Sequence, residues 1–492
     1  MTVTLDGRSL TIESAMDVVK GGASLKVSPE STRRMARFRS ILEQKIARGQ
    51  GAYGVDTGVG SLSDRPVKGD DLKRLQLNLV RSHSAGVGDP MPLDVVRSAM
   101  LIRINSLLNG NSAVRPIVVD LLAGMLNNDV TPYVPSFGSL GASGDLVPSA
   151  HMALTLVGEG KAYHRSSLVD SASALSAAHL KPLVALEAKE GLSLINGTCF
   201  TTAFGAIAVH RGKLLLEAAN SAVALTAQAQ NACMQSYDKR LVGLKRNAGQ
   251  QYIAKRLREL MKGSRMVRLG AIPQDPYSIR CVPQVHGSLK DALDFAERIT
   301  VDEMNSVSDN PILFEDGEVL HGGNFHAQPV AMSLDFLSIA LSYLAVMSQS
   351  RINLLLTKAP RRAKYMARTP GLESGLMILQ YTATALMADN ATLVYPQSAY
   401  PANVSEGVED HASHGVNAGL KALSVAANVS RVLAIEFICA SNALRTEHDG
   451  MSASSRRLCD SLKGLSPLLD GDRSLGEDIE RVAEAITGGK IS

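Results

Sequence analysis

The chain has 492 residues, enough by length alone for about three domains, and 45% of them are hydrophobic, which is ample for a large core. The net charge of +4, with no dense run of lysine or arginine, argues against a nucleic acid as partner; the strongest basic cluster, residues 358–364, is typical of a solvated loop. The five cysteines are isolated and lack C-x-x-C spacing, which argues against zinc and favours reduced thiols in a cytoplasmic protein.

Two features bear on the membrane. The first twelve residues lack the basic and then apolar pattern of a signal peptide. The longest apolar runs are interrupted by charged side chains, by Arg211, Lys213 and Glu217 in one run and by Asp335 in another. We take both runs to be too polar for membrane spans and expect a soluble protein.

The shorter elements are marked by turns and helix starts. Asp-Gly pairs at 6–7 and 316–317, each between strand-like runs, predict two β-hairpins. Pro29 follows Ser28 as in a first helical turn, and apolar residues then recur on one helical face until Gly49. The predicted helices in this part of the chain span residues 28–49, 92–108 and 115–127.

Three much longer helices are predicted over residues 198–233, 325–356 and 412–445. At 1.5 Å per residue each would be roughly 45 to 50 Å long. They are rich in alanine, leucine, serine and valine around most of their circumference, so they should be buried on most sides. We therefore expect a mainly α fold. Residues 196–492 would form a large bundle of long central helices, residues 1–195 a smaller loop-rich N-terminal part, and other subunits would cover the remaining apolar faces.

The stretch GSLGASGDLVPSAHM, residues 138–152, places three small residues before an apolar helix. The structural interpretation is a tight turn at Ala142 to Gly144, with Ser143 or Asp145 capping the helix. A serine hydrolase elbow does not fit, because the G-x-S-x-G pattern would need glycine where the chain has Asp145.

Further loops rich in glycine and asparagine lie between the predicted helices, where binding and catalytic residues are commonly placed. In chain order they are Tyr53–Gly60, Asn78–Gly88, Ile195–Thr198, Gln274–Arg280, Asn305–Pro311, His321–His326 and Glu409–His411. With GASGDL, these motifs resemble in the same order those of the aromatic amino acid ammonia-lyase family: histidine, phenylalanine and tyrosine ammonia-lyases and the related aminomutases. The resemblance covers residues 10–480 and is closest to the histidine ammonia-lyases.

The resemblance implies a prosthetic group made from the chain itself. Ala142, Ser143 and Gly144 would cyclise, with loss of two waters, to 4-methylidene-imidazol-5-one (MIO). Gly144 would supply an unhindered nitrogen and Ser143 the β-hydroxyl that is eliminated. This electrophile would bind the substrate amine and make it a better leaving group, so no external cofactor is expected. A metal site around Glu409 and His411 is not expected either, because the chemistry needs no metal.

The same resemblance assigns roles to other residues. Tyr53 would be the catalytic base, on a glycine-flanked loop that could close over the site. Asn196 and Tyr277 would orient the MIO carbonyl and the amine, and Arg280 would pair bidentately with the substrate carboxylate. Two further residues would line the pocket, Gln274 and Phe325. The plain structural alternatives are a packed tyrosine, a helix cap, an ion pair and a core phenylalanine.

Three residues bear on the substrate ring. His83 matches the ring-recognising position of histidine and tyrosine lyases, and Met377 resembles the histidine-lyase pocket. Glu409 is as in histidine lyases, where a carboxylate suits a ring with N–H donors. The departures from the family pattern, which keep the substrate open, are Val408, Asp56, Val59 and residues 357–370.

The first hypothesis is therefore a cytoplasmic carbon–nitrogen lyase that converts L-histidine to urocanate. It would be a homotetramer with active sites built from more than one subunit. The alternatives are a tyrosine or phenylalanine ammonia-lyase, a 2,3-aminomutase that returns the amine to the β-carbon, and a non-catalytic scaffold with the same fold. The expected partners are the amino-acid substrate and further copies of the chain, without nucleic acid or membrane.

Overall fold

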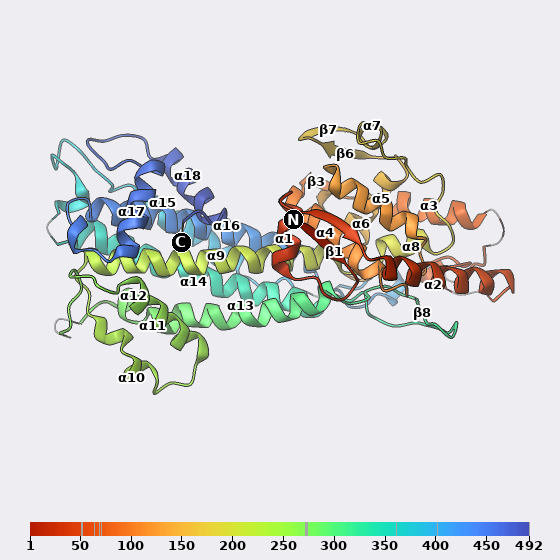
Figure 1. The fold of residues 1–492 in the computed structure, drawn as a ribbon, viewed down its shortest axis with the longest axis horizontal. Coiled ribbons are helices and arrows are strands. Elements are labelled where there is room, and N and C mark those ends of the chain that lie inside the picture. The colour runs from red at the N-terminus through yellow and green to blue at the C-terminus, as the bar shows by residue number, and fades with distance from the viewer. Residues whose placement is uncertain are drawn as a thin grey trace. The chain divides into compact units, whose positions relative to one another are not determined.

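The structure is a computed structural model that describes residues 1–50, 53–62, 64–67, 69, 71–270, 274–360, 362–400 and 402–491 (Figure 1). The helices are α1 Ile12–Val19, α2 Pro29–Ala47, α3 Asp71–His83, α4 Leu93–Leu107, α5 Pro116–Asn127, α6 Leu146–Leu156, α7 Ser171–Ala177, α8 Glu190–Ile195, α9 Cys199–Ala229, α10 Lys239–Val242, α11 Ala248–Leu260, α12 Tyr277–Arg280, α13 Val282–Met304, α14 Gln328–Lys358, α15 Leu379–Leu393, α16 Gly415–Ala443, α17 Ala453–Leu465 and α18 Gly476–Thr487. The strands are β1 Thr2–Leu5, β2 Ser24–Val27, β3 Val87–Pro90, β4 Val130–Pro132, β5 Pro135–Phe137, β6 Lys161–His164, β7 Ser167–Asp170, β8 Ile312–Leu313 and β9 Val319–Leu320. The predicted mainly α class is confirmed.

The strands form small sheets, and one of the two predicted hairpins is wrong. β8 and β9 pair antiparallel around Asp316 and Gly317, as expected. β1 instead pairs with β2 in parallel, and α1 lies between them in the chain. The Asp6 carboxylate accepts the backbone N–H groups of Arg8 and Ser9, which turns the chain toward α1 rather than back along β1. β3 pairs with β5, and β4, β6 and β7 form an antiparallel sheet that the sequence analysis did not predict.

The chain divides into two compact units that are not continuous in sequence. The first unit comprises Met1–Ile207, Ala296–Leu334 and Pro396–Leu420, and the second comprises Ala208–Phe295, Asp335–Tyr395 and Lys421–Ser492. The division between residues 195 and 196 stays a prediction. The first unit contains the motif loops around GASGDL, and the second contains most of each long helix.

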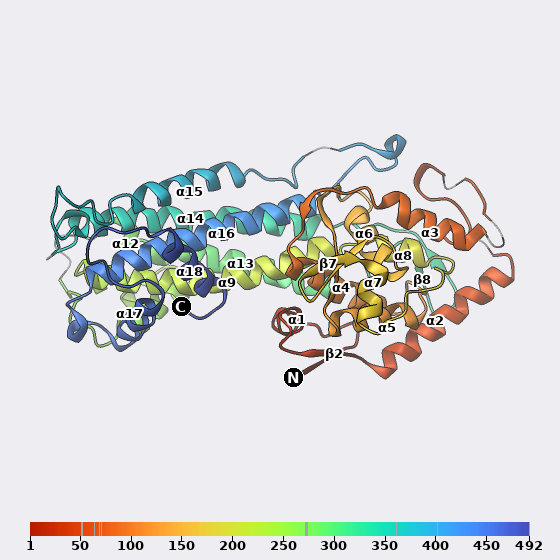
Figure 2. The same ribbon diagram turned by 90° about the horizontal axis from the view of Figure 1, so that it is seen from above.

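The three long helices predicted from composition are α9, α14 and α16, each within four residues of the expected ends. In the second unit they run side by side with α13, which the sequence analysis did not predict (Figures 1 and 2). Polar and charged residues interrupt the apolar residues of α13, so it lacks the continuous apolarity that marks the other three. Buried polar groups also join these helices; Thr226 of α9 donates to Glu436 of α16.

Two of these helices are apolar enough to resemble membrane spans. The most apolar windows of α14 and α16 have mean hydropathies of 1.8 and 1.6 and are 61% and 83% buried inside the protein. Asp335 therefore does not make the α14 run too polar, contrary to the sequence-based expectation. Burial is the better criterion, because the core helices of a soluble protein pass the same test of length and composition.

The core of the first unit positions the motif loops. α3, α6 and α8 pack against one another, and α4 is buried around its whole circumference. Arg103 of α4 is also buried, and its guanidinium donates to the carbonyls of Ser193 and Asn196 at 3.3 and 2.9 Å. These two hydrogen bonds fix the end of α8 and the loop that follows it.

Candidate active site

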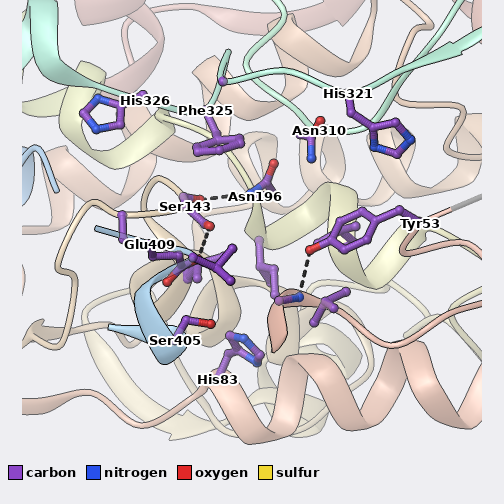
Figure 3. A pocket seen from close by; sticks show the side chains of 18 of the residues that line it. Tyr53, His83, Ser143, Asn196, Asn310, His321, Phe325, His326, Ser405 and Glu409 are labelled. Carbon is purple, nitrogen blue, oxygen red and sulfur yellow. Dashed lines mark hydrogen bonds between the residues drawn. The ribbon is translucent and has the colours of Figure 1, made fainter. Parts of the chain in front are cut away.

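A cavity of about 670 Å³ lies within the first unit and gathers most of the motif loops (Figure 3). Its lining residues are Tyr53, Val59, Gly60, Leu62, Leu79, His83, Ala142, Ser143, Leu146, Leu192, Ile195, Asn196, Asn310, His321, Gly322, Gly323, Phe325, His326, Ser405, Val408, Glu409, Asp410 and His411. Segments more than 350 residues apart in the chain, around Tyr53 and Glu409, therefore face one space.

The GASGDL turn lies against the loop between α8 and α9. Gly144 has a φ of +78° and forms an isolated β-bridge with Gly197. The N–H of Asp145 donates to the carbonyl of Gly197 at 2.7 Å. A Cβ atom on Gly144 would lie 2.3 Å from that same carbonyl oxygen, so only glycine permits this approach.

Asn196 holds the turn from the other side. Its Nδ2 donates to the carbonyl of Ser143 at 3.0 Å (Figure 3). Asn196 is also the C-cap residue of α8, and Arg103 binds its carbonyl, so the amide is held by fixed backbone. Its Oδ1 is buried with no hydrogen-bond partner among the residues that the structure describes. The side chain therefore points its donor at the small-residue turn.

Asp145 precedes α6 but does not cap it as expected. Its side chain makes no cap hydrogen bond and instead accepts the N–H and Oγ of Thr201 in α9, both at 2.7 Å. Complete burial raises the pKa of this carboxyl to about 6, although the two donors oppose the shift. The buried carboxyl thus links the start of α6 to the first turn of α9.

Glu409 and His83 lie near the turn. The Ser143 hydroxyl donates to Glu409, which belongs to a loop that pairs Val404 with Glu409 (Figure 3). His83 is the last residue of α3 rather than a loop residue, and its Nδ1 lies 2.8 Å from the carbonyl of Leu79. Its ring lines the same cavity and leaves Nε2 as a polar atom for a ligand.

Tyr53 lies on another wall of the cavity. Its hydroxyl accepts the backbone N–H of Gly60 at 2.9 Å, and its ring packs edge-on to His321 with centroids 5.9 Å apart. Phe325 lines the cavity above Ser143 in the view of Figure 3. The predicted positions of Tyr53 and Phe325 in the pocket thus agree with the geometry, while their roles stay predictions.

The cavity also contains residues for which the sequence motifs predict no role. Asn310, His321 and His326 line it, and His326 stacks on His411 with centroids 5.3 Å apart. Burial, followed by the neighbouring His411, lowers the pKa of His326. These residues lie in motif loops already noted, so their loops were the available signal. Within the described parts of the chain, no cluster of three or more histidine, cysteine, aspartate or glutamate residues is placed to hold a metal ion.

Four of the predicted site residues do not line this cavity: Gln274, Tyr277, Arg280 and Met377. All four belong to the second unit. There the Arg280 guanidinium donates to Gln274 Oε1 at 2.5 Å and stacks 4.7 Å from the centre of the Tyr277 ring. The Tyr277 side chain is largely exposed, at 69%. Gln274, Tyr277 and Arg280 therefore form a separate cluster of polar side chains that is partly exposed to solvent.

Comparisons with known proteins agree with this arrangement. The sequence profile of the aromatic amino acid lyases matches residues 10–463. The histidine ammonia-lyase of Symbiobacterium thermophilum is 41% identical over 490 residues, which are 99% of this chain and 96% of the relative. Among solved structures, histidine ammonia-lyase from Trypanosoma cruzi has a TM-score of 0.93 at 34% identity, covering 100% of this chain and 94% of that one. Tyrosine aminomutase from Streptomyces globisporus has a TM-score of 0.94 at 35% identity, covering 100% and 97%.

The chain therefore belongs to the aromatic amino acid lyase family. It is a carbon–nitrogen lyase, and members of this family use an MIO group.

The buried Asp145 carboxyl predicts a measurable pH dependence of stability. Its folded-state pKa of about 6 lies above the ordinary value of 3.8, so between these pH values the folded chain keeps a proton that the unfolded chain has lost. Stability should fall as pH rises through this window, by about 3 kcal/mol for a shift of this size. Asp145→Asn should abolish this part of the fall.

The measurement is the denaturant midpoint of wild type and variant at about pH 3.8, 5 and 6.5, which together cover the window from 3.8 to about 6. Asp316→Asn is the matched control, because Asp316 is exposed in a hairpin turn that suits either residue. Parallel pH profiles for wild type and Asp145→Asn would contradict the raised pKa of the buried carboxyl.

Proposed function

We propose that this chain eliminates ammonia from L-histidine to give urocanate, with an MIO group formed from Ala142, Ser143 and Gly144 and no external cofactor. The observation that carries the proposal is that the GASGDL turn, the Asn196 amide, Glu409 and His83 meet in one cavity. A full-length relative 41% identical is named a histidine ammonia-lyase, which supports the choice of substrate. The free cysteines fit a cytoplasmic enzyme.

The geometry of the turn suits cyclisation. The Gly144 nitrogen would bond to the Ala142 carbonyl carbon, whose oxygen leaves as one water, and the Ser143 hydroxyl would leave as the second. The Ser143 carbonyl oxygen remains in the product, and this is the oxygen that accepts from Asn196 Nδ2. Gly144 has no Cβ to block the approach of Gly197, and the positive φ is accessible to it. The residues present therefore fit the group.

Once formed, the group supplies an electrophilic carbon at the former Ser143 Cβ, which accepts the substrate amine. The chain's own residues do the rest. Asn196 stabilises negative charge that develops on the Ser143 oxygen, because its donor is already in place. Glu409, next to the Ser143 hydroxyl, can hold a proton of the departing amine, and His83 offers a polar atom to the imidazole.

Tyr53 is the proposed base that removes the β-proton. Its hydroxyl faces the cavity, and the Gly60 N–H that it accepts would stabilise a negative charge on the oxygen. The loop from Tyr53 to Gly60 crosses the cavity wall, where its closure would exclude water from the reaction.

The second candidate function is a tyrosine 2,3-aminomutase. A solved structure with that name has a TM-score of 0.94 at 35% identity. A histidine at position 83 can also hydrogen-bond a phenol, and Val408 departs from the histidine-lyase pattern. The aminomutase needs the same electrophile and base and differs in returning the amine to the β-carbon before release.

Substrate preference separates these functions. Wild type should release urocanate from histidine, and His83→Phe should lower kcat/KM for histidine by about tenfold to a hundredfold, the cost of losing one buried polar contact. The same change should favour phenylalanine, because an apolar wall replaces a polar one. The assay is product formation from histidine, tyrosine and phenylalanine, with a β-amino acid as the sign of aminomutase activity.

His164→Phe is the control for this assay, because His164 lies in β6 and does not line the cavity. A wild type that ignores histidine but converts tyrosine would contradict the histidine assignment. Unchanged ratios in His83→Phe would remove His83 from the ring pocket.

We also propose that the enzyme is a homotetramer whose active sites combine residues from more than one subunit. α14 exposes Phe336, Ile339, Tyr343 and Val346, each between 36% and 53%, at the spacing of one helical face. Such an apolar stripe suits contact with another copy of the chain. Gln274, Tyr277, Arg280 and Met377 would then enter the cavity of a neighbouring subunit rather than act alone.

Shared sites predict complementation between inactive variants. As pure tetramers, Ser143→Ala should lose all activity and Arg280→Ala should lose most of it. Chains of the two variants, unfolded together and refolded as mixed tetramers, should regain part of it, because some sites receive an intact half from each variant. The measurement is the activity of refolded mixtures against each variant refolded alone.

A mixture of Ser143→Ala with Tyr53→Phe is the matched control, because both changes lie in the same cavity and no pairing makes an intact site. Equal activity in the mixed and pure Arg280→Ala preparations would contradict shared sites.

A further inference from the structure

The short helix α12 carries both Tyr277 and Arg280, and it is one turn long. A single turn has little stability of its own, since forming the first hydrogen-bonded turn is unfavourable, and Cys281 separates α12 from the long helix α13. Two of its carbonyls accept hydrogen bonds from side chains that are completely buried in the second unit, Tyr237 and Arg351. Neither side chain has a part in the chemistry proposed above.

Tyr237 contributes the first of these bonds. It lies in a short 3-10 helix, Met234–Tyr237, and its hydroxyl donates to the carbonyl of Ile279 at 2.7 Å. Burial raises the pKa of the phenol far above its ordinary value, so the hydroxyl stays protonated and remains a donor. The accepting carbonyl belongs to the residue immediately before Arg280.

Arg351 of α14 contributes the second bond. Its Nη1 donates to the carbonyl of Ser278 at 3.2 Å, and its Nε and Nη2 bind the two carboxylate oxygens of Glu436 at 2.6 and 2.8 Å. Both partners of this ion pair are fully buried. A buried ion pair adds little net stability over apolar residues of similar volume. The one Arg351 donor group outside the ion pair that binds α12, Nη1, therefore points to a positional role.

A third attachment holds the chain just before α12. The Asp275 carboxylate accepts the backbone N–H of Cys233 at 2.6 Å and Arg268 Nη2 at 2.7 Å. The backbone is thus held both within α12 and just before it. The position of the Arg280 side chain depends on that backbone, because Gln274 binds its Nη1 and its guanidinium stacks on Tyr277.

We propose that Tyr237 and Arg351 are positioning residues, which aim the Arg280 guanidinium at the substrate carboxylate by holding the carbonyls of Ile279 and Ser278. This inference rests on the proposed role of Arg280. A bidentate pair needs both N–H groups aligned with the carboxylate, so a small rotation of α12 weakens it. The consequence is confined to ligands that carry a carboxylate.

Tyr237→Phe tests this in the full-length enzyme. The KM for histidine should rise about tenfold with a smaller change in kcat, as expected for one weakened contact to a charged group. Inhibition by histamine, which has the imidazole and amine but no carboxylate, should be unchanged. In the Arg280→Ala background, Tyr237→Phe should have no further effect on kcat/KM for histidine.

Tyr252→Phe is the matched control, because Tyr252 in the same unit donates to Glu217 and makes no bond to α12. If Tyr237→Phe does not assemble, the pair replacement Arg351→Met with Glu436→Leu removes the other bond without leaving an unpaired charge, and the same signature is expected.

Equal weakening of histidine and histamine, or an effect of Tyr237→Phe that adds fully to that of Arg280→Ala, would overturn the inference. Failure of the proposed role of Arg280 gives a different result, since Arg280→Ala alone would then leave the KM for histidine unchanged.

Discussion

The close approach of two glycine backbones, at Gly144 and Gly197, is the constraint on which the site depends. A Cβ on Gly144 would meet the Gly197 carbonyl at 2.3 Å, and a Cβ on Gly197 would meet the Ser308 carbonyl at 2.4 Å. Because neither position admits a side chain, the Ala142–Gly144 turn lies directly on the loop that carries Asn196. The hydrogen bond from Asn196 to the Ser143 carbonyl follows from this contact.

Buried charged groups fix this contact between the Ala142–Gly144 turn and the Asn196 loop. The groups proposed to move protons lie on other loops around it. Arg103 binds the Asn196 carbonyl, Asp145 binds Thr201, and Lys189 pairs with Asp309 at 2.7 Å. Each of these contacts is buried and joins segments far apart in the chain. Removing one partner therefore leaves a buried polar group unpaired. Tyr53 and Glu409, by contrast, lie on loops at the cavity wall. The electrophile would thus be held rigidly and the acid and base groups more loosely.

Local pattern was enough to predict part of the fold and site from the sequence. Continuous apolarity identified α9, α14 and α16, and the GASGDL motif identified the turn that lines the cavity. The Asp6-Gly7 hairpin was wrong because the partner of β1 lies beyond a helix, which turn chemistry does not reveal. The stacking of His326 on His411 and the bonds from Tyr237 and Arg351 to α12 depend on long-range packing, so no local pattern indicates them.

The most direct test of the glycine constraint is the mass of the peptide that contains Ala142 to Gly144, from wild type and from folded Gly197→Ala. The wild-type peptide should be lighter than its sequence by two waters. The Gly197→Ala peptide should keep the sequence mass in most molecules, because the added Cβ displaces the loop that holds the turn. A fully active wild type at its sequence mass, or complete loss of two waters in Gly197→Ala, would contradict this account.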